Sequence, residues 1–440
     1  MPNPILPLWE YIPDGEPRVF GDRVYLYGSH DRPACDGFCD FKLKVWSAPL
    51  DDLNHWQCHG DSFRTVDGER PSDVPWTDRE LFAPDVVCKD GKYYLYAYIV
   101  ASKGAVGVSE RPEGPFRLLG PYEYDCPVGD EGTFNDAGVL VDDDGRVYVY
   151  YGFTESHMNE IDPASMRRIL PGSYRRSVIA DGASVPEEQR FYEASSPRKI
   201  GDTYYLIYSP CRGSRLAYAT SDSPRGPFVY RGWIVDNGVD YPGGNNHGSI
   251  CRIGEQWYVF YHRMTNNTIM SRRACVERIQ ILPDGTIPPV EMTSLGFEKA
   301  LNPYALIPAE IACVLKGGCF VTERGIFERT VGNITDGCVI GYKYFDFGED
   351  YTGDGIRVCL KVRGLGTKCR VRVLLDGYEG GQEAGIVDVG LSDGVYTAKL
   401  APITGVHSLF LKAEHGVTGW TERYFAGKPL FELEALTFVK

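Results

Sequence analysis

The chain has 440 residues, which is too long for one ordinary hydrophobic core, so two domains are the first expectation. Its formal net charge of −14 argues against binding to nucleic acid or to an anionic membrane surface, and no apolar run is long enough to predict a membrane-spanning helix. Fifty glycines, 29 prolines and 29 tyrosines predict many short strands joined by turns.

The first residues, MPNPILPLWEYIPDG, lack the basic segment and apolar core of a secretory signal. The 13 cysteines are scattered singly, which is typical of reduced thiols. We therefore expect a cytoplasmic protein. Cys35 and Cys39 are spaced like half of a metal site, but no second pair follows at ligand spacing.

One pattern returns five times along the chain: a tight turn with glycine and an acidic residue, then an alternating strand rich in aromatic residues. The copies are GDRVYLYGS at 21–29, DGKYYLYAY at 90–98, DGRVYVYYG at 144–152, GDTYYLIYS at 201–209 and GEQWYVFYH at 254–262. A spacing of roughly 55 residues suits a four-stranded antiparallel sheet with its loops. Five such sheets arranged radially predict an all-β, five-bladed β-propeller, and a stack of β-sandwiches is the second choice.

One polar residue precedes each aromatic strand at a similar distance. Counted back from Tyr25, Tyr94, Tyr148, Tyr205 and Tyr258, they lie 9 to 12 residues upstream: Asp14, Asp85, Asp136, Glu193 and His247. Because the innermost strand of each blade lines the central channel, similar offsets would gather these groups at one end of the channel. Carboxylates repel one another and are costly to bury unpaired. One such acid alone is typical of a surface loop, whereas the matched set predicts a functional site.

Gathered carboxylates suit cleavage of a glycosidic bond, which needs an acid and a base, or a site for a hard metal ion. Glu193 follows two aromatic residues, and an apolar setting raises the pKa of a carboxyl group, which favours Glu193 as the general acid. Asp14 lies in a wetter loop and would stay ionised as the general base. Asp136 would adjust the pKa of Glu193. His247 is either a channel residue that holds water, directly or through a metal ion, or a buried core histidine.

The aromatic repeat ends near Pro289, and LNPYALIP at 301–308 is interpreted as a linker. From 309 to 440 the chain again alternates with a period of two but lacks the aromatic repeat, as in IRVCLKVRG, CRVRVLLDG and FELEALTFV. This pattern predicts a separate β-sandwich of the jelly-roll type. The predicted domains are therefore 1–300 and 309–440.

These motifs resemble those of glycoside hydrolase family 43, the inverting glycosidases built on a five-bladed propeller. FAPDVVCKDGKYYLYA is similar to the family's WAPD motif, with Phe82 in place of tryptophan. NDAGVLVDDDGRVYVYYG resembles the motif with the pKa-modulating aspartate, here Asp136, although Ala137 replaces the usual proline. FYEASSPRKIGDTYYLIYS is similar to the motif with the general acid, here Glu193, and NNHGSI to the motif with the channel histidine, here His247.

The first blade departs from the family pattern. Family members usually carry Asp-Pro a few residues before a Val-Phe pair. Here PDGEPRVF places Asp14 five residues before Val19, but a glycine follows it, and Glu16 precedes a proline instead. Spacing favours Asp14 as the base, and Glu16 stays the alternative. Asp31, in GSHD, matches a family position expected to touch the substrate.

The resemblance also implies other substrate contacts. Phe82 and Asp85, from the WAPD-like motif, are expected at the sugar. Arg272 and Arg273 precede the last propeller strand, where the family often has a basic residue at the sugar. We select Arg273 as the candidate, and salt bridges that close the propeller are the alternative.

The C-terminal sandwich resembles a family 6 carbohydrate-binding module. IPAE at 307–310 and the terminal FELEALTFV are similar to its first and last strands, which often hold a structural calcium ion in that family, so Glu310 and Glu434 are candidate ligands. Trp420 and Tyr424, in GWTERYF, are candidates for sugar binding. Alternatively, Trp420 packs against the propeller or forms one wall of its pocket.

The resemblance thus implies an inverting, exo-acting glycosidase on pentose-containing oligosaccharides, of the α-L-arabinofuranosidase or β-xylosidase type. Catalysis would need no cofactor, and a structural calcium ion is compatible with it. The expected partner is an oligosaccharide, with neither nucleic acid nor membrane, and no oligomeric state is assigned. Because the first-blade motif is altered, the alternative interpretation is a propeller that binds sugar without cleaving it. A metal-dependent hydrolase of another class is disfavoured because the site has one histidine.

Overall fold

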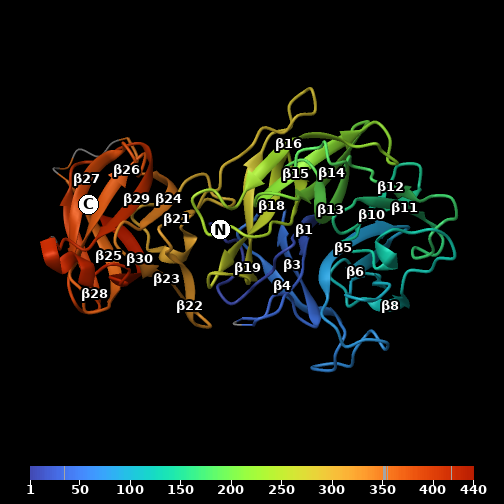
Figure 1. Cartoon of the computed structure of the whole chain (residues 1–440), viewed down its shortest axis with the longest axis horizontal. Helices are drawn as coiled ribbons and strands as arrows, with labels where there is room; N and C mark the ends of the chain where they lie inside the picture. Colours follow the sequence, from blue (N-terminus) through green and yellow to red (C-terminus); the bar gives the residue numbers. More distant parts are fainter. Residues whose placement is uncertain (34, 350–352, 354, 418) are drawn as a thin grey trace.

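The computed structural model describes residues 1–33, 35–349, 353, 355–417 and 419–440, which form β-strands joined by turns and loops. The short 3-10 helices of this part are η1 (Asp130–Gly132), η2 (Ala309–Ile311) and η3 (Gly419–Tyr424). None of the described helices is long and apolar enough to cross a membrane. Figure 1 shows two lobes side by side, a larger one that contains the N-terminus and a smaller one that contains the C-terminus.

The larger lobe is a five-bladed β-propeller, which confirms the fold predicted from the repeats. Blade 1 contains β1 (Glu16–Phe20), β2 (Arg23–Tyr27), β3 (Lys42–Pro49) and β4 (Gln57–Arg64). Blade 2 contains β5 (Phe82–Lys89), β6 (Lys92–Tyr98), β7 (Ala105–Ser109) and β8 (Arg117–Gly120). Blade 3 contains β9 (Gly138–Val141), β10 (Val147–Tyr151), β11 (His157–Ile161) and β12 (Arg175–Arg176). Blade 4 contains β13 (Phe191–Ile200), β14 (Thr203–Pro210), β15 (Arg215–Ser221) and β16 (Val229–Asp236). Blade 5 contains β17 (Ser249–Ile253), β18 (Gln256–Thr265) and β19 (Thr268–Ile279).

The repeated turn is the hairpin between the first two strands of a blade. In four blades it has two residues, as in blade 2, where Lys89 pairs with Lys92 around Asp90 and Gly91. Both turn residues have positive φ, at 52° and 74°, the conformation that Asp-Gly adopts in tight hairpins. Blade 3 differs from the expected pattern, because Val141 pairs with Val147 and leaves a five-residue loop.

The aromatic strand is buried on both faces because each blade packs between two others. In β10, Val147, Val149 and Tyr151 pack towards blade 2, whereas Tyr148 and Tyr150 pack towards blade 4. Successive side chains of a strand point to opposite faces, and here both faces are buried against neighbouring blades. The strand is therefore hydrophobic at consecutive positions.

The N-terminal segment closes the ring. Blade 5 has three strands of its own, and residues 3–5 run beside the outermost of them, β19. The Ile5 N–H donates to the Ala274 carbonyl at 3.0 Å, and the buried Asn3 side chain exchanges two hydrogen bonds of 2.8 Å with the Val276 backbone. The first and last parts of the propeller are therefore joined by hydrogen bonds.

The smaller lobe is a β-sandwich of two antiparallel sheets. One sheet contains β20 (Ile307–Pro308), β22 (Phe320–Gly325), β23 (Glu328–Ile334), β25 (Ile356–Gly364), β28 (Gly394–Leu400) and β30 (Phe431–Val439). The other contains β21 (Val314–Lys316), β24 (Val339–Asp346), β26 (Cys369–Leu375), β27 (Gln382–Val389) and β29 (Val406–Glu414). The first sandwich strand begins at Ile307, inside the segment interpreted as a linker, and the division into domains 1–300 and 309–440 stays a prediction.

Several polar contacts cross the interface between the two lobes, which we call the seam. The Tyr11 hydroxyl donates to Glu323 Oε2 at 2.9 Å, and Arg329 Nη2 donates to the Leu8 carbonyl at 2.8 Å. At another point, Asp240 accepts from the Tyr378 hydroxyl at 2.8 Å. The sandwich therefore contacts the N-terminal segment that leads to Asp14.

Ring closure predicts a sensitive position at Asn3. Replacement of Asn3 by Ala removes buried hydrogen bonds to Val276, Glu277 and Thr293, among them both bonds to the Val276 backbone. We expect a loss of roughly 2–4 kcal/mol in unfolding free energy, measured as a lower Tm by calorimetry. Asn54→Ala, at an exposed loop residue, is the control. Equal Tm values for the two variants would contradict the closing role of Asn3.

Candidate active site

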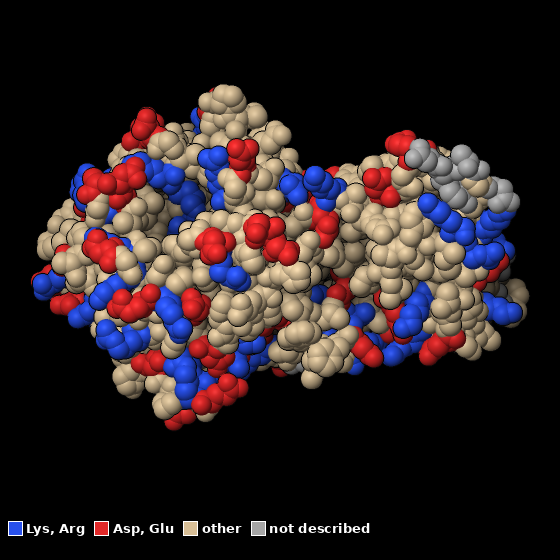
Figure 2. Space-filling model, turned by 180° about the vertical axis from the view of Figure 1, so that it is seen from behind, with Lys and Arg blue, Asp and Glu red and all other residues tan. Residues whose placement is uncertain are grey.

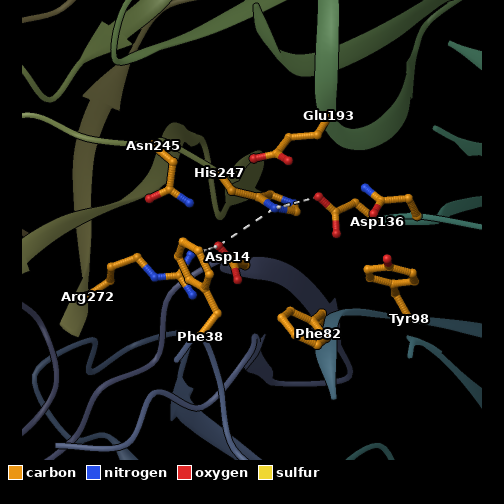
Figure 3. A pocket seen from close by; sticks show the side chains of 10 residues that line it. Asp14, Phe38, Phe82, Tyr98, Asp136, Glu193, Asn245, His247 and Arg272 are labelled. Atoms are coloured by element: carbon orange, nitrogen blue, oxygen red, sulfur yellow. Dashed lines mark hydrogen bonds and ion pairs between the residues drawn. The ribbon is translucent and has the colours of Figure 1, made fainter. Parts of the chain in front are cut away.

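A cavity of about 170 Å³ lies at one end of the propeller channel. All five blades or their loops contribute to its wall, and the lining residues are Asp14, Phe38, Phe82, Tyr98, Asn135, Asp136, Glu193, Asn245, His247 and Arg272. Figure 3 shows the carboxyl groups of Asp14, Asp136 and Glu193 directed into one space around His247. The structure thus brings together four of the five residues predicted from matched offsets.

Asp14 is a buried carboxylate held in place by donors. It has a left-handed backbone (φ 56°), and its Oδ2 accepts a hydrogen bond of 2.6 Å from the Ser29 hydroxyl. Its Oδ1 accepts from Arg272 Nη1 at 2.9 Å. Burial alone would raise the pKa of Asp14, but the positive charge of Arg272 and the hydrogen bond from Ser29 outweigh burial and lower this pKa. Asp14 is therefore ionised at neutral pH.

Arg272 organises this side of the pocket from β19. Its guanidinium and backbone N–H donate three hydrogen bonds of 2.8–2.9 Å to Asp31, and the ring of Phe38 lies 5.0 Å from its Cζ. Asp31 was expected to touch the substrate, and this expectation is wrong for the structure described. Asp31 is fully buried, does not line the pocket and instead fixes the arginine that pairs with Asp14.

Glu193 enters the pocket from a β-bulge in β13. The pairing with β14 shifts on both sides of Glu193, and Ala194 has a φ of 71°, so the bulge re-aims the side chain. Burial, together with the negative charge of Asp14, raises the pKa of Glu193 to about 7 although Arg272 opposes the shift. Glu193 therefore retains a proton over much of the range in which Asp14 is ionised.

His247 lies between Asp14 and Asp136 in the pocket. His247 Nδ1 is 3.7 Å from Asp14 Oδ1 and 3.7 Å from Asp136 Oδ2 (Figure 3). Burial and the charges of Glu193 and Asp14 raise the pKa of Asp136 well above its usual range. Burial lowers the pKa of His247, so the imidazole is neutral. Asp136 and Glu193 interact strongly and titrate as a pair.

His262 is a functional candidate that the sequence analysis did not select. The backbone N–H of Asp14 donates to His262 Nδ1 at 3.3 Å, so the ring proton is on Nε2, which donates to the Asn245 carbonyl at 2.9 Å. Burial and the charge of Arg272 lower the pKa of His262 to about 3. This neutral ring links the Asp14 loop to Asn245 of the pocket wall. The only sequence signal was its position at the end of the fifth repeat.

Comparison with known proteins assigns the family. The model of glycosyl hydrolases family 43 matches residues 1–287. The chain is 36% identical to a xylosidase/arabinosidase of Thermoclostridium stercorarium, over 93% of this chain and 95% of that protein. The chain belongs to glycoside hydrolase family 43. Family 43 enzymes hydrolyse glycosidic bonds with inversion of the anomeric configuration, and this catalysis needs no cofactor.

Solved structures agree with the fold of this family 43 enzyme. A β-xylosidase/α-arabinofuranosidase from a compost microbial metagenome, solved with xylotriose in a calcium-free form, has a TM-score of 0.56 and 27% identity, over 66% of this chain and 99% of that chain. An arabinoxylan arabinofuranohydrolase of Bacillus subtilis has a TM-score of 0.55 over 100% of this chain and 97% of that chain. At 23% identity, the second likeness shows the fold alone.

Asp85 and Glu16 lie one layer below the pocket, not in its wall. Arg18 Nη2 is 2.7 Å from Asp85 and 3.2 Å from Glu16, and Asp85 also accepts from the Val139 N–H at 2.8 Å. Glu16 pairs with Arg198 and accepts from Ser196 at 2.8 Å. The expected substrate contact of Asp85 is therefore wrong, because its oxygens join three blades. Of the two first-blade acids, the structure places Asp14 in the pocket.

The predicted substrate contact of Arg273 is also wrong. Neighbouring residues in a strand point to opposite faces, so when Arg272 faces the pocket, Arg273 faces away from it. Arg273 is buried, and its guanidinium lies 3.5 Å from the Leu6 carbonyl and 3.7 Å from Glu310 Oε2. It therefore contributes to the seam, because its acidic neighbour Glu310 belongs to the sandwich and not to another blade.

Trp420 does not line the pocket. It lies in η3 with 75% of its surface exposed and packs edge-on against Tyr424, with ring centroids 6.1 Å apart. The pocket wall expected from Trp420 is therefore absent, while its role in sugar binding and the carbohydrate-binding-module assignment stay predictions. Phe38 and Tyr98 supply pocket aromatics that the sequence analysis missed, and Phe82 lines the pocket, while its contact with the sugar stays a prediction.

The candidate calcium ligands have cationic neighbours instead. Glu310 faces Arg273, and Glu434 Oε2 is 2.7 Å from Lys361 Nζ. Within the described ranges, no three carboxylate, imidazole or thiolate groups gather as a metal site. Near His247, the guanidinium of Arg272 already neutralises Asp14. These residues therefore do not fit a calcium site.

The raised pKa of Glu193 predicts a pH-dependent stability difference. The folded state holds this proton more tightly than the unfolded state, so wild-type stability falls as pH rises from about 4.5 to about 7. Glu193→Gln lacks this titration. We expect the variant to match the wild type near pH 4 and to exceed it by on the order of 2 kcal/mol at pH 8, measured by denaturant unfolding.

Glu188→Gln is the matched control, because Glu188 is exposed and close in sequence. Its effect on stability should be small and independent of pH. A Glu193→Gln effect that is equal at pH 4 and pH 8 would contradict the raised pKa.

Proposed function

We propose that this family 43 enzyme is an exo-acting glycosidase that releases single pentosyl units from oligosaccharides, of the α-L-arabinofuranosidase or β-xylosidase type. The observation that carries the proposal is the pair of carboxyl groups in one pocket, Glu193 with a raised pKa and Asp14 with a lowered pKa. Two carboxyl groups whose pKa values are shifted in opposite directions can act as a general acid and a general base. The pentose preference is supported by relatives named xylosidase/arabinosidase.

In the proposed reaction, Asp14 accepts a proton from water while the water oxygen attacks the anomeric carbon. Glu193 donates its proton to the glycosidic oxygen as the bond from that oxygen to the anomeric carbon breaks. Attack on the face opposite the leaving group inverts the configuration. Afterwards Asp14 carries the proton taken from water, Glu193 is ionised because its proton has gone to the leaving group, and exchange with solvent restores both groups.

The neighbouring residues keep these protonation states. Arg272 stabilises the ionised form of Asp14 through the 2.9 Å hydrogen bond. Asp136, whose own pKa is raised, lies close enough to Glu193 for the two to titrate together and so adjusts the acid. The neutral His247 adds no positive charge that would favour ionisation of Glu193.

Exo action is supported by the size and floor of the pocket. A cavity of about 170 Å³ is smaller than the ~300–1,000 Å³ typical of small-molecule sites, so one sugar ring suits it better than a chain. Below it, Glu16, Arg18, Asp85, Ser196 and Arg198 fill the channel with paired polar groups. A sugar chain would therefore enter only by its end.

We also propose a cytoplasmic location and imported short oligosaccharides as substrates. The structure contains 13 free cysteines, which suits a reducing compartment. Neither nucleic acid nor a membrane is proposed as a partner, in line with the net charge of −14. On the face in Figure 2, acidic and basic side chains are interspersed.

A panel of nitrophenyl glycosides tests the function. We expect the wild type to hydrolyse the α-L-arabinofuranoside or the β-D-xyloside and to spare the β-D-galactoside. Glu193→Gln should lower kcat on an unactivated xylo-oligosaccharide by roughly 10²–10⁴-fold, because general acid catalysis is lost. Near-normal turnover would remove Glu193 as the acid, and Glu188→Gln should match the wild type.

A second comparison decides the base. Asp14→Gly should lose activity by roughly 10²–10⁴-fold, while its left-handed backbone suits glycine and the missing carboxylate leaves room for an anion. Added azide should restore turnover and yield a glycosyl azide of inverted configuration, detected by NMR. Glu16→Gln should keep most of its activity per folded molecule. Loss in Glu16→Gln with full activity in Asp14→Gly would reverse the assignment.

A further inference from the structure

A second cavity, of about 270 Å³, lies at the seam between the propeller and the sandwich. Leu8 contributes from the propeller segment, and the sandwich contributes Leu306, Phe327, Arg329, Lys361 and Glu434, with further residues between them. We call this cavity the seam cleft. It shares no lining residue with the catalytic pocket.

An exposed aromatic pair borders the seam cleft. Phe327, at the β22–β23 turn, is 68% exposed, and Trp9, next to Leu8, is 46% exposed. Their ring centroids are 5.4 Å apart with an interplanar angle of 81°. Leu306 adds a third exposed apolar side chain at 67%. Large apolar side chains gathered in the open around a cavity are typical of a binding surface.

Two buried polar groups that line the cleft lack hydrogen-bond partners among the described residues. Glu310 Oε2 has none, although the side chain is only 7% exposed and its ion partner Arg273 is 3.7 Å away. Arg329 Nε has none, although its side chain is fully buried. Buried polar groups are normally hydrogen-bonded, so both side chains keep hydrogen-bonding capacity that no contact among the described residues uses.

The charges of the seam cleft balance. Three acidic residues, Glu310, Glu328 and Glu434, are matched by three basic residues, Arg329, Lys361 and Arg363. Such a lining gives no net attraction for an anion such as phosphate or for a cation. Apolar walls with convergent donors and acceptors instead fit a neutral ligand rich in hydroxyl groups.

We infer that the seam cleft is a second sugar-binding site, which holds one ring of a neutral pentose oligosaccharide. The aromatic pair would pack against the C–H face of the ring, and the partly exposed Lys361, Arg363 and Glu434 of the lining would bond its hydroxyl groups. The inference rests on the proposed function for the class of sugar. Trp9 lies five residues before Asp14, so their Cα atoms are at most about 18 Å apart.

Such a site would make the sandwich a part of substrate binding. Its walls come from both lobes, and the Arg329 bond to the Leu8 carbonyl already joins them at the cleft. A sugar that contacts both walls binds best when the seam is closed. Binding would therefore stabilise the folded two-lobe form by mass action.

The test uses xylotriose and the Glu193→Gln variant, which binds the sugar without cleaving it. We expect isothermal titration calorimetry to resolve two sites per chain. Adding Phe327→Ala should weaken the second site by about tenfold or more and leave the first unchanged. Adding Val395→Ala instead is the matched control, because Val395 is an exposed apolar side chain of the sandwich that does not line the cleft, and both sites should remain.

One site per chain in Glu193→Gln, unaffected by Phe327→Ala, would overturn the inference. So would loss of the second site in Trp420→Ala alone, which would place it at η3. A dimer in light scattering that Phe327→Ala dissociates would show that a second copy covers the cleft, which also overturns it. Hydrolysis of nitrophenyl pentosides by the wild type reports separately on the proposed function, so failure of the seam site and failure of that function are distinguishable.

Discussion

The structure of the site depends on Arg272. Asp14 and Asp31 are both buried, and two carboxylates in such a place are costly without a compensating charge. Arg272 bonds both, and it donates to each with good geometry. The ionised Asp14 in turn raises the pKa of Glu193 through the space of the pocket. One guanidinium on β19 therefore separates the pKa values of the two carboxyl groups that the reaction needs.

The arginine can do this only because the ring is closed. Arg272 belongs to blade 5, whereas Asp14 and Asp31 belong to the segments around blade 1, so the ion pairs cross the junction between the ends of the propeller. Asn3 and Ile5 hold the same junction from the outside. Stability and catalysis are thus coupled at the junction, and weakening the outer hydrogen bonds would also loosen the geometry of Asp14.

The offsets along the sequence predicted the fold and much of the site because each blade repeats the same strand geometry. Residues 11 or 12 positions before the reference tyrosine lie in the pocket, namely Asp14, Phe82, Asp136, Glu193 and His247. Residues nine positions before it lie one layer deeper, namely Glu16, Asp85, Ser196 and Ser249, where Ser196 and Ser249 are 2.6 Å apart. A stricter count would have placed Glu16 and Asp85 together below the pocket. Asp85 was misassigned because a difference of two or three residues moves a side chain to another layer.

Other residues could not be found in this way, because they lie outside the repeated strand. Phe38 and Asn245 come from loops whose paths depend on tertiary contacts, and loops carry no periodic signal. Arg272 and Arg273 differ only in the face to which they point, and a one-residue error in register exchanges them. His262 is a donor and acceptor between two backbones, a role that needs the folded arrangement of three segments. The local sequence pattern therefore predicts the level of the channel at which a side chain lies. Long-range contacts decide which side chains meet at that level.

The second lobe also contacts the segment that positions the site. The segment that carries Asp14 to its position is the same one that the sandwich contacts through Leu8 and Tyr11, with the ring of Tyr11 5.4 Å from the Arg329 guanidinium. The sandwich thus contacts the segment that leads to Asp14, the proposed base. A module that served only to anchor a polymer would need no such bonds to a catalytic loop, and a flexible tether would suit it better. Its buried polar contacts with the propeller therefore favour a role in positioning the site and in holding part of the substrate over a role as a separate anchor.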